Sequence, residues 1–199
     1  MLPGARPLKI QLQRTRSGPA ARGFRAVILL AFGLTALVAA GHPKGFHKRV
    51  VLTVEGSRIG GVVVMDVDDS ERAELLRATA DADHDGVLSA KETKFLRDKL
   101  VSLATQKLKV SISAHPITLP VKDVRLSLRQ EKRVGEAGMS VAVMLESELP
   151  GKLVSNMVLS VSDSAPDGSP VQVDLSQVDG GVARGELEPG GELELRLSK

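Results

Sequence analysis

Most of residues 108–199 alternate between apolar and polar side chains, and this alternation restricts the possible folds more than any other feature. Side chains that alternate in this way point to opposite faces of a β-strand, so the pattern predicts strands rather than helices. Turn-forming groups separate the alternating runs, and short strands at this spacing are typical of an antiparallel sandwich or barrel. These groups are Pro150-Gly151, Pro166-Asp167-Gly168, Asp179-Gly180-Gly181 and Pro189-Gly190-Gly191.

Two more strands are predicted earlier in the chain. Residues 49–67 alternate on both sides of the turn-prone group Glu55-Gly56-Ser57, which predicts a β-hairpin. Gly60 and Gly61 lie within the second strand and are typical of a bulge or a bend.

Two helices are predicted between this hairpin and the β-rich region. Residues 71–80 follow the polar run 68–70, whose side chains can cap a first helical turn. A second segment has one apolar face at helical spacing, made by Phe95, Leu96, Leu100 and Leu103. The sequence therefore predicts an α+β fold, in which an antiparallel β-sandwich-like domain carries an inserted helix-loop-helix unit.

The composition limits which ligands such a domain can bind. Hydrophobic residues make up 42% of the chain, but the aromatics are four Phe with no Tyr and no Trp. Grooves that stack sugars or single-stranded bases usually need aromatic side chains, so both kinds of ligand are disfavoured. The net charge of +3 falls to −3 without the six basic residues that precede residue 41, which argues against nucleic-acid binding.

The first 41 residues have the pattern of an export signal. A basic region is followed by the uncharged apolar run 26–40, which is shorter than the roughly 20 residues of a comfortable bilayer span. We expect a signal peptide in residues 1–41 and export to the periplasm or the exterior. An uncleaved anchor to the inner membrane through residues 26–40 is the alternative. Because the chain has no Cys, disulfides and thiolate metal sites are excluded, and such an exported domain suits a bacterial envelope.

Residues 81–92 read DADHDGVLSAKE and place three aspartates at every second position. Carboxylates this close repel one another, so a folded loop needs something that compensates their charge. The stretch matches the pattern D-x-[DN]-x-[DN]-G-x₅-E and lies between the two predicted helices. Ser89 and Glu92 also form an S-x-x-E capping box, which starts the second helix inside the acidic stretch.

This helix-loop-helix resembles an EF-hand, and the resemblance implies a calcium site. In that family a Ca²⁺ ion takes six to eight oxygen ligands from a 12-residue loop. The implied ligands are Asp81, Asp83 and Asp85, the backbone carbonyl of Val87, Ser89 through a water, and both carboxylate oxygens of Glu92. Gly86 would permit the sharp turn at the sixth position, and Mg²⁺ is disfavoured because the loop offers more oxygens than an octahedral ion takes.

The resemblance also raises the question of what supports a single hand. In paired EF-hands, the residue at the position of Leu88 joins a short β-bridge to a sister loop. The sequence has no second loop, so the hand must contact either another copy in a homodimer or the β-rich domain. Ala80 and Arg77 replace the aromatic residues common before the loop, which favours a static, structural site over a calmodulin-like opening.

A second resemblance concerns residues 42–130. The start GHPKGFHKRVVLTV, the strand pair and the single hand look like the exported amino-terminal portions of bacterial proteins related to hydrogenase- and urease-accessory nickel permeases. Transmembrane permease helices are missing, so transport is not implied. The alternative function is therefore that of a periplasmic accessory protein for nickel or copper uptake. His42 and His47, with an α-amine if cleavage follows Gly41, would bind the metal.

Catalytic motifs are absent from the sequence. It has no Cys nucleophile, no G-x-S-x-G and no glycine-rich phosphate loop, so we expect a binding or structural protein rather than an enzyme. The expected partners are calcium and an envelope or membrane protein. The predicted parts are a signal peptide or anchor (1–41), a β-hairpin (42–67), the EF-hand unit (68–107) and a β-rich domain that packs with the hairpin (108–199).

Overall fold

The computed structural model describes residues 45–129, 132–149, 156–178 and 180–198. The predicted export segment, residues 1–41, and His42 lie outside the described residues. Within them the helices are α2 (Glu71–Ala80) and α3 (Ala90–Thr105), and the strands are β1 (Phe46–Glu55), β2 (Arg58–Val67), β3 (Lys109–Ile112), β4 (His115–Ile117), β5 (Val121–Leu128), β6 (Met139–Glu148), β7 (Val158–Ser162), β8 (Val171–Gln177), β9 (Val182–Leu187) and β10 (Glu192–Arg196). No helix in these ranges is long and apolar enough to span a membrane.

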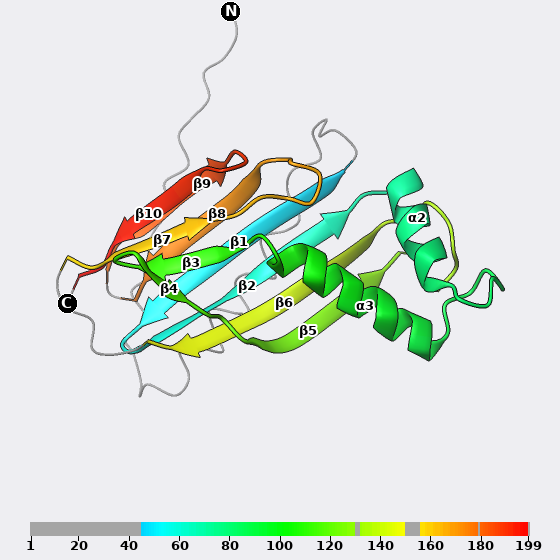
Figure 1. The fold of residues 1–199 in the computed structure, drawn as a ribbon, viewed down its shortest axis with the longest axis horizontal. Coiled ribbons are helices and arrows are strands. Elements are labelled where there is room, and N and C mark those ends of the chain that lie inside the picture. The colour runs from blue at the N-terminus through cyan, green and yellow to red at the C-terminus, as the bar shows by residue number, and fades with distance from the viewer. Residues whose placement is uncertain (1–44, 130–131, 150–155, 179, 199) are drawn as a thin grey trace, which may run out of the picture. The chain divides into compact units, whose positions relative to one another are not determined.

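The strands form two sheets, so the predicted α+β sandwich-like fold is confirmed at this level. One sheet has the order β5-β6-β2-β1-β8-β9 and the other has the order β10-β7-β3-β4. Figure 1 shows the smaller sheet and α3 over the same face of the larger sheet. β1 and β2 form the predicted hairpin, which begins at Phe46 and turns at Gly56, where φ is +56° and a glycine is favoured.

One strand pair departs from the predicted antiparallel arrangement. β1 and β8 run parallel, from Lys48 opposite Val171 to Val54 opposite Gln177. β7 belongs to the other sheet, so the chain crosses between the sheets before β8 and arrives beside β1 in the same direction. Alternation along a strand reports which face a side chain occupies but not the direction of the neighbouring strand, so the sequence pattern missed this pair.

A single core of aliphatic side chains lies between the layers. Leu52 and Ile59 from the larger sheet and Leu159 from the smaller sheet are fully buried there. α3 adds Leu96, Leu100 and Ala104, which recur every four residues and pack on the larger sheet beside β2 and β6. Phe95 was expected on this face, but it is 53% exposed because it lies to one side of that buried stripe.

Candidate metal centre

The acidic residues lie in the connection between α2 and α3. α2 begins after Ser70, whose hydroxyl accepts a hydrogen bond from the Ala73 N–H. α3 begins after Ser89, which caps it with the reciprocal bonds predicted for a capping box. Local sequence therefore ends one helix at Ala80 and starts the next at Ala90, so residues 81–89 remain as a short loop.

Three carboxylates of this loop converge. One oxygen from each of Asp81, Asp83 and Asp85 lies within 4.8 Å of the others, which is close enough for all three to hold one metal ion. Asp83 and Asp85 are exposed, whereas Asp81 is buried. The chain can turn this tightly because Gly86 has a φ of +80°, in the left-handed region that favours glycine.

Backbone N–H groups orient the three carboxylates. The Gly86 N–H donates to Asp81 Oδ2 over 3.1 Å, and the Val87 N–H donates to Asp85 Oδ1 over 2.7 Å. The Asp85 N–H donates to Asp83 Oδ1 over 3.3 Å. In each case the aspartate side chain bonds to a residue further along the loop, so the loop curls around its own acidic groups.

One side-chain oxygen of Asp81 has no hydrogen-bond partner. Asp81 is 5% exposed, and its Oδ1 atom is buried without a partner among the described residues. A buried carboxylate oxygen without a donor or a cation is costly, and native structures contain few of them. A cation bound by Asp81 would supply this missing interaction.

Glu92 does not join this cluster. Its Oε1 accepts the Ala82 N–H over 2.7 Å, and its Oε2 accepts the Ser89 N–H over 2.9 Å. Hydrogen bonds from the Ser89 hydroxyl and from these two N–H groups lower the pKa of Glu92 to about 2. The carboxylate is therefore ionised at neutral pH, but both oxygens are engaged by the backbone at the ends of the loop.

The other two predicted ligands are Val87 and Ser89. Val87 exposes 46% of its surface, and the Ser89 hydroxyl accepts the Glu92 N–H over 3.4 Å. Val87 pairs with Arg133 in an isolated antiparallel bridge. The two hydrogen bonds of that bridge use Gly86 and Leu88, so they do not engage the Val87 carbonyl.

This bridge joins the loop to the β5–β6 connection. The Leu88 N–H donates to the Lys132 carbonyl over 2.8 Å, and the Val134 N–H donates to the Gly86 carbonyl over 2.9 Å. The Leu88 side chain is fully buried in the core. Of the two supports considered from sequence, the β-rich domain therefore makes the contact at this edge. A homodimer formed through the same edge stays a prediction, and it would have to displace this bridge.

Arg77 makes a second connection that sequence reasoning missed. This residue of α2 is fully buried, and Nη1 donates to the Arg133 carbonyl over 2.7 Å. Nη2 donates to the carbonyls of Arg129 and Gly138, at 2.8 Å and 3.1 Å. The only sequence signal was an arginine among the small and charged residues of a short helix, and this does not distinguish a buried guanidinium from a solvated one.

Of the two histidines predicted to bind nickel or copper, His47 lies within the described residues and His42 lies outside them. The His47 Nε2 atom is 2.6 Å from Asp68 Oδ2 at the end of the hairpin. His84, within the acidic loop, is exposed and has a φ of +60°.

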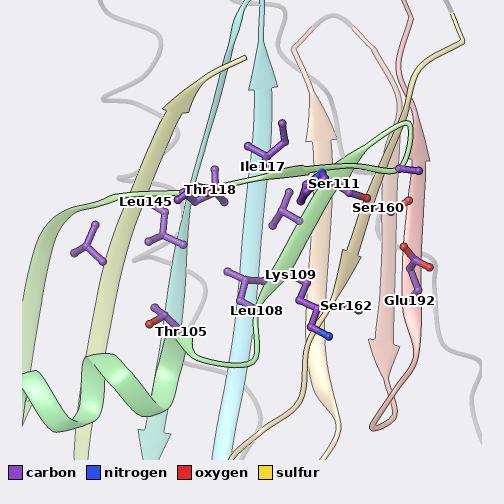
Figure 2. Close-up of a pocket in the computed structure, with 15 residues that line it drawn as sticks. Thr105, Leu108, Lys109, Ser111, Ile117, Thr118, Leu145, Ser160, Ser162 and Glu192 are labelled. Atoms are coloured by element: carbon purple, nitrogen blue, oxygen red, sulfur yellow. The ribbon is translucent and has the colours of Figure 1, made fainter. Parts of the chain in front are cut away.

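A hollow of about 610 Å³ lies beside β3 and β4 (Figure 2). Among the described residues that line it, none belongs to the acidic loop, and hydroxyl groups come from Thr105, Ser111, Thr118, Ser160 and Ser162. Its charged lining residues are Lys109 and Glu192, so the hollow does not hold a pair of carboxylates.

The geometry of the α2–α3 loop is thus the main indication of function. No protein-family model matches the chain, and no curated protein matches it either.

Proposed function

We propose that the protein binds one calcium ion in the loop 81–92, in the manner of a single EF-hand. Asp81, Asp83 and Asp85 would supply side-chain oxygens, Val87 its backbone carbonyl, and Ser89 a water-mediated contact. Glu92 would close the site. The observation that carries the proposal is the convergence of the Asp81, Asp83 and Asp85 carboxylates, together with a buried Asp81 Oδ1 that has no hydrogen-bond partner among the described residues.

The donor set favours calcium over other common ions. Every proposed ligand atom is an oxygen, which suits a hard cation, and the four acids bring a formal charge of −4. Nickel and copper prefer sites that include imidazole nitrogen, whereas the loop's histidine occupies the fourth position and points away from the ion in the family's geometry. Magnesium requires near-ideal octahedral geometry and usually keeps several waters, so a loop with this many protein oxygens fits it less well.

Calcium binding would change the bonding of Glu92. To ligate with both oxygens, its carboxylate must leave the N–H groups of Ala82 and Ser89, which hold it now. The ion therefore competes with hydrogen bonds that already satisfy the same carboxylate. We expect a modest affinity for this reason, in the range of about 10⁻⁴–10⁻³ M that extracellular modules show.

The proposed role is structural. The metal loop is bonded to the β5–β6 connection, and α3 packs on the sheet that contains β6. Calcium would therefore order the helical unit against the β-sandwich. With the export signal expected in residues 1–41, this supports a binding or scaffolding protein of the bacterial envelope, whose partner would be an envelope or membrane protein.

The test is calorimetric titration of the full chain, first freed of metal with a chelator. Calcium should bind wild type with a stoichiometry of one. Glu92→Gln should weaken binding by orders of magnitude because glutamine lacks the charge and the second anionic oxygen, although it can still accept a bond at this capping position. Glu74→Gln removes an exposed acid of α2 outside the loop and should bind calcium like wild type.

Two results would contradict the proposal. One is the absence of a calcium heat for wild type at several millimolar calcium, and the other is equal affinity in wild type and Glu92→Gln. Nickel and copper titrations address the alternative function. Tight binding of either metal that His47→Ala abolishes and Glu92→Gln preserves would favour the accessory role in transition-metal uptake.

A further inference from the structure

An amine and a carboxyl group meet in the interior between the two sheets. Lys48 lies on the core-facing side of β1, between the buried residues Phe46 and Val50. Asp163 directly follows β7 in the smaller sheet. Both side chains are 0% exposed, and Lys48 Nζ donates to Asp163 Oδ1 over 2.7 Å. The contact joins the two layers across the sandwich.

The pair has apolar neighbours in the larger sheet and few hydrogen-bond partners. In the larger sheet, Lys48 lies between Met65 of β2 and Val171 of β8. Asp163 Oδ1 also accepts the Ser164 N–H over 2.8 Å, but its Oδ2 atom has no hydrogen-bond partner among the described residues. A buried ion pair is stable only when further hydrogen bonds satisfy its remaining atoms, and these are missing at Oδ2.

Burial favours the uncharged form of both groups. Desolvation lowers the pKa of Lys48 and raises the pKa of Asp163, against the opposing effect of their mutual hydrogen bond. A neutral amine is a nucleophile, and a neutral carboxylic acid can lose its hydroxyl group as water. A salt of the two, which forms in water, does not react in this way.

We propose that Lys48 and Asp163 condense to an intramolecular amide bond that covalently joins β1 to the end of β7. The Nζ lone pair attacks the Asp163 Cγ atom, the Nζ–Cγ bond forms, and the Cγ–Oδ2 bond breaks. One proton of the amine passes to the departing hydroxyl group, so one water molecule leaves. The step needs no oxidant, cofactor or second substrate.

The geometry supports each part of this step. The hydrogen bond to Oδ1 holds Nζ next to the carbon that it attacks, which removes most of the entropic barrier of a bimolecular reaction. The departing oxygen is Oδ2, the atom without a partner, while Oδ1 remains as the amide oxygen and keeps the Ser164 N–H. Because both side chains are 0% exposed, solvent water has little access to hydrolyse the product.

The bond would serve a chain that cannot form a disulfide. The sequence contains no Cys, and Lys48 and Asp163 are 115 residues apart. A cross-link that closes so long a loop reduces the conformational freedom of the unfolded state, as a disulfide does. It would also tie the first strand of the larger sheet to the smaller sheet.

Intact-mass spectrometry of the denatured full chain tests the proposal. Wild type should be lighter than its sequence mass by one water, and digestion should yield one branched peptide containing Lys48 and Asp163. Lys48→Met keeps a long side chain without the amine and should have its full sequence mass. Asp163→Asn retains a carbonyl that the amine can attack, so any condensation there should release one ammonia instead of water.

A wild-type mass equal to the sequence mass after the folded protein has been incubated would overturn the proposal, and the pair would then be a non-covalent contact only. A mass deficit that persists in Lys48→Met would also overturn it, because the lost water would come from another site. The wild-type measurement does not depend on whether either variant folds. Calcium-free protein should show the same deficit, so failure here is distinct from failure of the proposed calcium site.

Discussion

Asp81 and Glu92 stand at the two ends of one loop, but their surroundings differ. Asp81 is buried with one oxygen unpartnered, and Glu92 has both oxygens bonded to backbone N–H groups. The first arrangement leaves a cost that a cation would remove, and the second stabilises the loop without any cation. Glu92 therefore stabilises the metal-free loop, whereas the unpartnered oxygen of Asp81 would gain a partner only in the metal-bound loop.

Glu92 predicts how the stability of the metal-free protein depends on pH. The pKa of this carboxyl is about 2 in the folded protein and lies at its ordinary value of 4.5 in the unfolded chain. Because the folded-state value is depressed, the contribution of Glu92 is fully present above about pH 4.5 and is lost as the pH falls toward 2. Urea denaturation at a series of pH values should show wild type losing more stability across this window than Glu92→Gln. Equal losses would contradict the prediction.

At the scale of elements, α2 and the loop are held by the β5–β6 connection. Arg77 bonds to three backbone carbonyls of that connection, and the bridge at Val87 adds two backbone bonds. Paired EF-hands have a bridge between two loops, but the partner of Val87 here is Arg133, which lies in the connection between β5 and β6. The proposed metal site and the larger sheet are therefore connected through Arg129 and residues 132–138.

Replacement of Arg77 by methionine tests this connection. Arg77→Met fills similar space but leaves the carbonyls of Arg129, Arg133 and Gly138 without their buried donor, so we expect a loss of about 3 kcal/mol in the free energy of unfolding. Calcium affinity should also fall, because α2 would no longer hold the start of the loop. Arg97→Met, at an exposed arginine whose partner is the adjacent Asp98, is the matched control and should change stability little. Equal stability of the two variants would contradict this account.

At the scale of the whole molecule, calcium should stabilise the folded state. The converging carboxylates depend on the fold, so the unfolded chain should bind the ion much more weakly. At a calcium concentration of 100 times Kd, the expected gain is about 2.7 kcal/mol. Thermal unfolding of the full chain should therefore shift to higher temperature with calcium, and the shift should be much smaller for Glu92→Gln. No shift at several millimolar calcium would contradict a structural role.

The sequence alone determined the features that depend on neighbouring residues. Asp81, Asp83 and Gly86 are close in the chain, so their spacing already specified a tight acidic loop, and the capping pair Ser89 and Glu92 specified where α3 starts. Alternation likewise predicted the strands, because the faces of a strand follow from a period of two. It predicted the buried face of α3 only in part, since Phe95 lies outside the stripe that packs on the sheet.

The tertiary structure decided every contact between distant segments. β8 lies parallel to β1, Arg77 reaches the β5–β6 connection, and Lys48 meets Asp163 over a separation of 115 residues. A local pattern specifies the face that a side chain occupies, but its partner depends on how the layers pack as a whole. The acidic loop could therefore be predicted from twelve consecutive residues. Its contacts with the β5–β6 connection and the buried Lys48–Asp163 pair could be identified only from the fold.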